Sequence, residues 1–256
     1  MEEKPKYGWY VKNLIIGFNI LGFIGLTALI YGLSIEGLMQ IILMILGLAV
    51  VLVFLWPGIG MLFMNLFLLR EMPKINLVAR MKALNEIDNP QILDVGCGTG
   101  RTAIKIAKTL KNEGHLFGID IYSKFAISGN TLDTIQKNAK IENVEDKTTF
   151  QHGTAINIPF EKNSFDIVNV SSVLHEVHDP NGRSKAMAEL YRVLKPGGYL
   201  YLGEWNRTSW QLIAFCGLCC FVFKHKDYWE KLLNENGFKD INYENFIGFG
   251  IFTARK

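Results

Sequence analysis

Long apolar runs open the chain, and mixed apolar and polar positions follow. Across residues 14–69 the only charged residue is Glu36, whereas acidic and basic residues recur throughout the remainder. Residues 13–33 and 38–56 are two uncharged runs. Runs of about 20 apolar residues, rising about 1.5 Å per residue, can cross a hydrocarbon layer roughly 30 Å thick. The pattern therefore predicts a membrane anchor over residues 1–70 with two transmembrane helices.

Charge placement predicts how this anchor is oriented. The link of residues 34–37 is too short for anything but an antiparallel return, so the two helices form a hairpin. Two full-length runs in succession also argue against a cleaved signal peptide. Basic residues flank the hairpin on both outer sides: Lys4, Lys6, Lys12, Arg70, Lys74, Arg80 and Lys82. By the positive-inside rule, we expect a multi-pass membrane protein with both termini and the catalytic part in the cytoplasm.

The Pro-Gly-Ile-Gly stretch of residues 57–60 allows two continuations. Proline and glycine disrupt helices, so residues 61–69 either form a separate apolar stretch along the membrane interface or continue the second helix to Leu69 through a kink. A linker helix is expected over residues 71–90.

From residue 91 onward, strand-like and helix-like patterns alternate. Short β-branched and aliphatic runs predict buried strands, and apolar residues at helical spacing predict the helices between them. Such alternation indicates an α/β fold, a mostly parallel sheet with helices on both faces. Strands are expected at 91–95, 115–120, 165–170 and 199–203, helices at 102–110, 128–139 and 185–193, and a closing antiparallel strand at 246–254.

A glycine-rich segment at residues 94–100 follows the first strand. Missing side chains let a ligand approach the backbone there. A dinucleotide site requires G-x-G-x-x-G, but the third glycine, Gly100, comes one position early and Arg101 stands where glycine is needed. Asp120 ends the next strand, where a carboxylate can accept both hydroxyls of a ribose. These residues predict a nucleoside-containing ligand without a pyrophosphate.

Four ordered segments, residues 92–100, 118–120, 158–168 and 191–198, resemble the successive motifs of class I S-adenosylmethionine-dependent methyltransferases. The resemblance covers residues 91–256 and is closest to the branch that includes quinone, sterol and lipid methyltransferases. It implies a Rossmann-like, seven-stranded sheet and S-adenosylmethionine as the cofactor.

The resemblance also implies a set of cofactor-binding residues. The glycine segment would hold the methionine and ribose portions, Asp120 the ribose hydroxyls and Ile121 the adenine ring. Many relatives carry an aspartate where this chain has Thr154, although a hydroxyl can also pair with an amino group. The full set is Asp94, Gly96, Cys97, Gly98, Gly100, Asp120, Ile121, Thr154, Ala155 and Ser171.

Methyl transfer from a sulfonium is an in-line displacement that depends mainly on positioning, so no metal is required. A base matters only for a protonated acceptor, and the candidates are His175, Glu176 and Glu204, each just past a strand. The histidine spacing there does not match a zinc site, and Cys216, Cys219 and Cys220 are read as small buried hydrophobes. A net charge of +3 with interspersed signs does not suggest nucleic-acid binding.

The predicted anchor suggests an apolar acceptor dissolved in the membrane, such as a lipid or an isoprenoid quinone. The alternatives are a membrane-anchored protein or peptide methyltransferase and a non-catalytic cofactor-binding scaffold. The apolar run of residues 210–223 is either an interfacial element, with Phe221 and Phe223 toward the membrane, or a buried helix. Removal of residues 1–69 is expected to leave cofactor binding intact.

Overall fold

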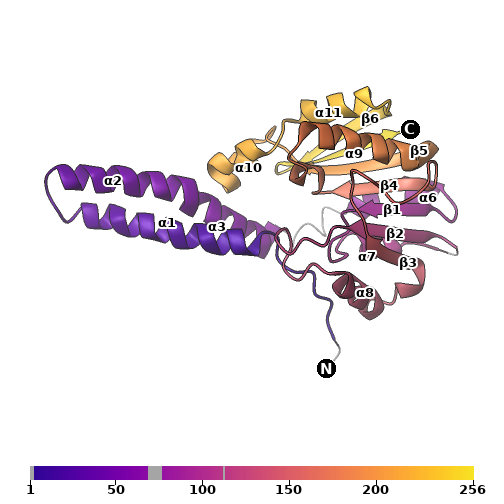
Figure 1. Ribbon diagram of the computed structural model, residues 1–256, viewed down its shortest axis with the longest axis horizontal. Helices are drawn as coiled ribbons and strands as arrows, with labels where there is room; N and C mark the ends of the chain where they lie inside the picture. The colour runs from indigo at the N-terminus through magenta and orange to yellow at the C-terminus, as the bar shows by residue number, and fades with distance from the viewer. Residues whose placement is uncertain (1–2, 69–76, 112) are drawn as a thin grey trace.

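The computed structural model describes residues 3–68, 77–111 and 113–256 and shows an apolar helical hairpin attached to an α/β domain (Figure 1). The first helix is α1 (Lys12–Gly32). The second is continuous and is built from α2 (Leu38–Val50), the π-helical η1 (Val51–Leu55), α3 (Trp56–Phe63) and the π-helical η2 (Met64–Leu68).

The second helix runs through Pro57, so the first of the two continuations, a break at residues 57–60 with a separate interfacial stretch, is not adopted. Proline lacks an N–H and removes one α-helical hydrogen bond. The π-helical turns of η1 directly before α3 change the hydrogen-bond register at this point, which lets the helix continue. The alternative, a helix continued beyond Trp56, is confirmed; residues 69–76, with Arg70 and Lys74, lie outside the described residues.

Glycines bring the two helices of the hairpin close together. A Cβ on Gly47 would lie 2.7 Å from the backbone nitrogen of Leu29, and one on Gly25 would lie 2.5 Å from Cγ1 of Val50. Such small-residue contacts let two helical backbones pack directly. The large apolar side chains, among them Ile20, Ile24 and Ile45, point outward and are exposed.

The α/β domain is one seven-stranded sheet in the order β3-β2-β1-β4-β5-β7-β6. Pairing is parallel from β3 to β5, and β7 is antiparallel to both β5 and β6, which confirms the mostly parallel sheet. The expected closing strand is β7, while Phe246 ends β6. The strands are β1 (Gln91–Val95), β2 (His115–Asp120), β3 (Thr148–His152), β4 (Phe165–Ser171), β5 (Leu194–Trp205), β6 (Lys239–Phe246) and β7 (Phe249–Arg255).

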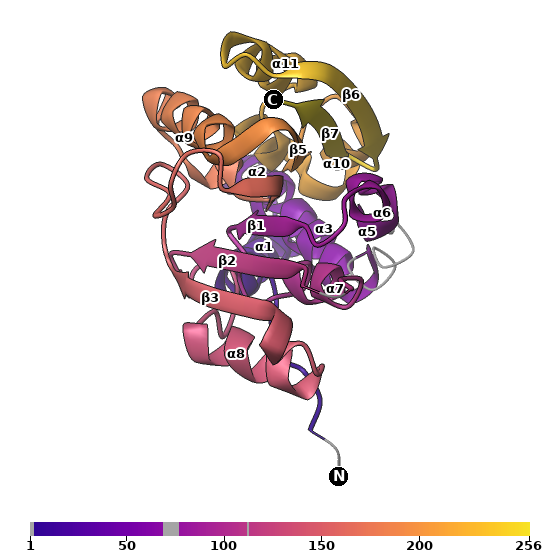
Figure 2. The same ribbon diagram turned by 90° about the vertical axis from the view of Figure 1, so that its right-hand side faces the viewer.

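Helices cover both faces of this sheet (Figure 2). One apolar core joins the strands to α9 (Pro180–Val193) and α11 (Lys226–Glu235). The other joins them to α7 (Ala103–Ala107) and α8 (Leu132–Ile141). In the predicted linker, the described part forms two short helices rather than one, and 3-10 turns complete the domain: α5 (Leu77–Arg80), α6 (Ala83–Glu86), η3 (Glu145–Lys147) and η4 (Leu174–Glu176).

The hairpin meets the domain through the element that follows β5. There α10 (Trp210–Cys216) packs on α3, where the indole N–H of Trp56 donates to the carbonyl of Ala214 (2.8 Å). The rings of Phe63 and Phe215 stack at 5.7 Å. Because α10 follows the carboxyl end of β5, the carboxyl edge of the sheet faces the base of the hairpin.

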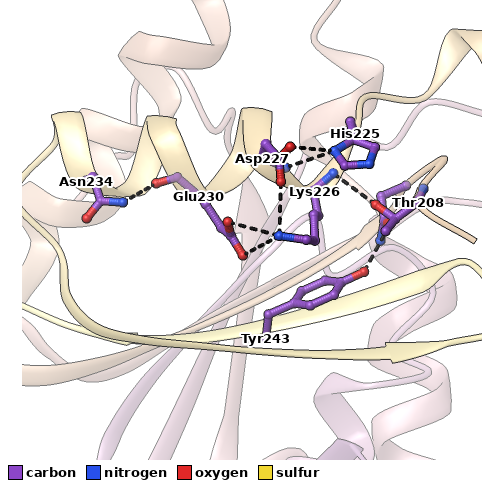
Figure 3. Close-up of polar contacts among 8 residues, drawn as sticks. Thr208, His225, Lys226, Asp227, Glu230, Asn234 and Tyr243 are labelled. Carbon is purple, nitrogen blue, oxygen red and sulfur yellow. Dashed lines mark hydrogen bonds and ion pairs between the residues drawn. The ribbon is translucent and has the colours of Figure 1, made fainter.

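Residues 209–223, here called the apolar loop, comprise α10 and the 3-10 helix η5 (Gly217–Val222). Its two ends are held together, since Arg207 N–H donates to the carbonyl of Lys224 (3.2 Å) and Lys226 N–H donates to Oγ1 of Thr208 (3.1 Å). The Lys226 side chain in turn contacts Asp227 and Glu230 (Figure 3). The polar contacts fix the ends of the loop and leave its apolar middle projecting.

Candidate active site

The glycine segment after β1 bends through conformations that other residues rarely adopt. Gly96, Gly98 and Gly100 have φ values of 73°, 54° and 90°. A Cβ on Gly96 would lie 2.2 Å from Cγ2 of Val173. Glycine is required here for backbone conformation and for space, and the bend leaves main chain exposed to a ligand at the carboxyl end of β1.

Asp120 stands at the end of β2 with its carboxylate fixed against this loop. Oδ2 accepts the N–H of Gly98 (2.8 Å), and Oδ1 accepts the N–H of Tyr122 (2.5 Å) and Nδ2 of Asn130 (3.2 Å). A carboxylate can accept about four hydrogen bonds, so capacity for a ligand hydroxyl remains. This geometry suits the predicted role of holding a ribose.

Asp94 is buried beneath the same loop. Its Oδ1 accepts Nδ2 of Asn169 (2.6 Å) from the neighbouring strand β4. Burial raises the pKa of Asp94 to about 7, with Asn169 lowering it and the Asp120 carboxylate raising it further. A carboxyl group with this pKa ionises readily when a cation approaches. It therefore fits a ligand that carries a sulfonium and an ammonium group.

Cys97 contributes differently from its neighbours in the glycine segment. Its thiol lies in the core near Gly118, and burial raises its pKa well above the ordinary value. Its N–H donates to the carbonyl of Ile119 (3.1 Å). The Cys97 side chain is thus structural.

The remaining predicted cofactor residues lie along the same edge of the sheet. Ile121 follows Asp120 directly and is exposed. Thr154, two residues after β3, forms an isolated bridge with Asn157, and Ala155 beside it is buried. Ser171 ends β4. The fold therefore brings these positions to one edge, where their binding roles remain predictions.

His175 and Glu204 form a buried pair. Glu204 is fully buried, and its carboxylate accepts the N–H groups of Val173 (3.0 Å) and Leu174 (2.6 Å) as well as Nδ1 of His175 (2.7 Å). Burial alone lowers the pKa of His175, but Glu204, with a smaller contribution from Glu176, outweighs this effect and raises it to about 10. His175 is consequently protonated at neutral pH, which is unfavourable for a general base.

Glu176 is more open than this pair. One of its oxygens lies 3.4 Å from Nε2 of His175, and that hydrogen bond lowers the pKa of Glu176. Its carboxylate is half exposed and ionised near neutral pH. Of the three catalytic candidates, it has the most exposed side chain.

Within the described part of the chain, most of the buried polar side-chain atoms without a hydrogen-bond partner belong to residues in or next to the glycine segment, and Nε1 of Trp229 in α11 is the exception. They include Nε of Arg101, Oδ1 of Asn130 and Oδ1 of Asn169. Buried polar atoms are nearly always paired, so this cluster fits a polar ligand such as the cofactor. The sequence reasoning did not select Asn130 or Asn169, although an asparagine within the apolar strand β4 was a signal for Asn169.

Residues 6–11, here called the strap, cross the glycine segment on their way into α1. The carbonyl of Tyr7 accepts Oγ1 of Thr99 (2.9 Å) and a terminal nitrogen of Arg101 (3.3 Å). The first residues of the predicted anchor are therefore part of the cofactor edge. The expectation that removal of residues 1–69 spares cofactor binding does not fit this contact.

Comparison with known proteins agrees with the geometry. The family described as "Methyltransferase domain" matches residues 93–202. This match shows a methyltransferase domain over residues 93–202, and the strand order and the glycine segment agree with it. S-adenosylmethionine is its cofactor.

Among curated relatives, a demethylmenaquinone methyltransferase of Lactiplantibacillus plantarum is 32% identical over 133 residues, 52% of each chain. That of Staphylococcus saprophyticus is 29% identical over 195 residues, 66% of this chain and 78% of the relative. The chain thus spans about half the length of the first relative. A solved S-adenosylmethionine-dependent methyltransferase of Methanosarcina mazei shares the fold, with a TM-score of 0.55 and 24% identity over 69% of this chain and 97% of that one.

Proposed function

We propose that this protein transfers a methyl group from S-adenosylmethionine to an isoprenoid quinone of the demethylmenaquinone type, dissolved in the membrane. The observation that carries the proposal is the position of the cofactor edge, which faces the base of an apolar hairpin (Figure 1). An acceptor diffusing in the bilayer would reach the sulfonium from that side. The demethylmenaquinone methyltransferases among its relatives support this acceptor class.

The surface of the hairpin supports a membrane-spanning role. In the most apolar 18-residue stretch of each helix, only 17% of the first helix and 11% of the second is buried. The core helix of a soluble protein is mostly buried, whereas a lipid-facing helix exposes its large apolar side chains. We propose that both helices span the bilayer and that both termini lie in the cytoplasm, following the basic flanks.

The apolar loop adds a second membrane contact beside the hairpin. Trp210, Leu218 and Phe221 are 71%, 59% and 65% exposed. Arg207 and Lys224 lie at the two ends of the loop, where basic side chains favour anionic headgroups. The loop would therefore rest in the membrane interface and hold the active-site edge against it.

The chemistry follows from positioning. The acceptor nucleophile must lie in line with the sulfonium carbon, and Asp94 and Asp120 would fix the cofactor for that approach. Glu204 would position protonated His175, and the positive charge of that ring would stabilise negative charge on an acceptor oxygen, since both ring nitrogens already face carboxylates. In this proposal Glu176 is the group available to accept a proton.

The experiment is methyl transfer in proteoliposomes that contain reduced demethylmenaquinone and labelled S-adenosylmethionine. Label is expected in the organic extract, with Asp120→Ala losing most of the rate at subsaturating cofactor. Label recovered in protein instead would favour the protein methyltransferase alternative. Cofactor binding without transfer to the quinone or to membrane lipids would favour the scaffold.

A further inference from the structure

The strap is held in place on both of its sides. Lys6 and Asn138 exchange two hydrogen bonds, from Lys6 N–H to Oδ1 (2.8 Å) and from Nδ2 to the Lys6 carbonyl (2.9 Å). Ser128 N–H donates to the carbonyl of Trp9 (2.9 Å), and Val11 N–H donates to that of Ala126 (2.8 Å). The strap is thus a short irregular segment bonded to α8 and to the loop that follows β2.

A second set of bonds ties the strap to the hairpin. Tyr10 N–H donates to Oδ1 of Asn65 (3.0 Å), and Nδ2 of Asn65 donates back to the Tyr10 carbonyl (3.3 Å). Asn65 lies in η2, at the domain end of the second long helix. The start of α1 and the end of the second helix are therefore joined at the strap.

Arg101 is the charged side chain that the strap encloses. One terminal nitrogen donates to the carbonyls of Tyr7 (3.3 Å) and Gly8 (3.1 Å). The guanidinium carbon lies 5.7 Å and 5.5 Å from the ring centroids of Tyr7 and Tyr10. Nε is buried without a partner, and no acidic side chain of the described residues pairs with this cation. A partly buried cation without a counter-charge favours an anionic ligand.

Charges of both signs lie around the glycine segment and the strap, and they match the amino-acid end of the cofactor. Burial raises the pKa of Tyr10, Arg101 lowers it, and Asp94 and Asp120 raise it, so these groups share one electrostatic environment. The methionine portion carries an ammonium group and a carboxylate. The ammonium suits the carboxyl groups of Asp94 and Asp120, and the carboxylate suits Arg101.

We propose that Arg101, held by the strap, binds the carboxylate of the amino-acid portion of S-adenosylmethionine, and that cofactor affinity therefore depends on the Asn65 contact in the hairpin. This inference concerns cofactor binding and does not depend on the acceptor. Because the strap contacts both the hairpin and Arg101, a substitution that displaces the strap from the hairpin should also change the affinity for the cofactor.

The test compares two ligands by calorimetry on the full chain in detergent. S-adenosylhomocysteine carries the amino-acid portion, whereas 5′-methylthioadenosine carries the same nucleoside without it. Arg101→Gln should lower the affinity for S-adenosylhomocysteine about tenfold or more, which is the loss expected for a charge-assisted hydrogen bond. The affinity for 5′-methylthioadenosine should fall less than about twofold. Equal weakening of both ligands, or unchanged affinity for S-adenosylhomocysteine, would overturn the carboxylate assignment.

The dependence on the strap is tested with Asn65→Ala and Gly8→Ala. Gly8 has a φ of 65°, and a Cβ there would lie 2.1 Å from the carbonyl oxygen of Ser128, so alanine displaces the strap. Both variants should show the same ligand-selective weakening. Thr27→Ala, an exposed hairpin position bonded within its own helix, is the matched control and should leave both affinities unchanged. Normal S-adenosylhomocysteine affinity in both strap variants would overturn the dependence on the hairpin.

Discussion

Asp120 carries the clearest single-residue prediction. Its carboxylate accepts bonds from Gly98, Tyr122 and Asn130 and would accept the ribose hydroxyls. Asp120→Ala is expected to weaken S-adenosylmethionine binding by about 1.5–3 kcal/mol, the scale of hydrogen bonds to a charged group. Calorimetry measures the loss, and thermal unfolding of the variant shows whether the fold is retained. Unchanged affinity would exclude the ribose assignment.

His175 gives a prediction for pH. Its pKa is raised from 6.5 to about 10 in the folded protein, so its protonated form stabilises the fold. That stabilisation is complete below about pH 6.5 and is lost as the pH rises through about 10. The midpoint of thermal unfolding should therefore fall more between pH 7 and 10 in the wild type than in His175→Gln. Parallel pH curves for the two proteins would contradict the His175–Glu204 ion pair.

Single residues also show the limit of sequence reasoning. Asp94, the glycines and Asp120 were identified because each stands at a strand end with a local pattern around it. The contact of Arg101 with Tyr7 joins residues 94 positions apart, and no local pattern reports such a contact. The burial of the Cys97 thiol in the core was likewise not predictable, because the direction of this side chain depends on how the glycine segment bends.

At the scale of elements, the packing of α10 on α3 depends on Gly60. A Cβ on Gly60 would lie 1.6 Å from the carbonyl oxygen of Phe215. Gly60→Leu should displace the apolar loop and speed tryptic cleavage at Arg207 and Lys224. Gly17→Leu, on an open face of α1 with no neighbouring atom within 4 Å, is the control. Equal cleavage rates in the two variants would show that α10 does not rely on this contact.

Elements with a strong apolar period were predictable, and those with mixed composition were not. The hairpin helices follow from long apolar runs, and β1, β2, β4 and β5 follow from short β-branched and aliphatic runs. β3 has the sequence Thr-Thr-Phe-Gln-His and lies at the edge of the sheet, where polar side chains are accommodated, so it gave no strand pattern. The continuation of the second helix through Pro57 depends on a π-helical segment that residue propensities do not encode.

For the whole molecule, we predict that both termini and the methyltransferase domain lie in the cytoplasm. Lys4 and Lys6 lie before the first helix, Lys12 begins it, and Glu36 is the charge in the connecting loop. In right-side-out vesicles the domain should resist added protease, and detergent should abolish this protection. Digestion in intact vesicles would require the opposite orientation.

The sequence predicted an anchor and a catalytic domain but not their relation. Which edge of the sheet faces the hairpin is set by the strap and by α10, both of which form long-range contacts. Phe223 illustrates the same point, since it was expected to face the membrane with Phe221. Its ring instead lies 5.4 Å from that of His175, so it belongs to the site and not to the membrane-facing surface.

The central claim is that the acceptor reaches the active site from the bilayer, and one comparison tests it most directly. Methyl transfer to a quinone acceptor is measured in vesicles and in detergent dispersion. The wild type is compared with a double variant that carries both Leu218→Asp and Phe221→Asp. Charges on these exposed side chains make interfacial burial costly while leaving the strap and the glycine segment untouched. We predict normal cofactor affinity, nearly normal transfer to the dispersed acceptor and a loss of about tenfold or more on the bilayer acceptor. Equal losses on both forms of the acceptor would contradict lateral access from the membrane.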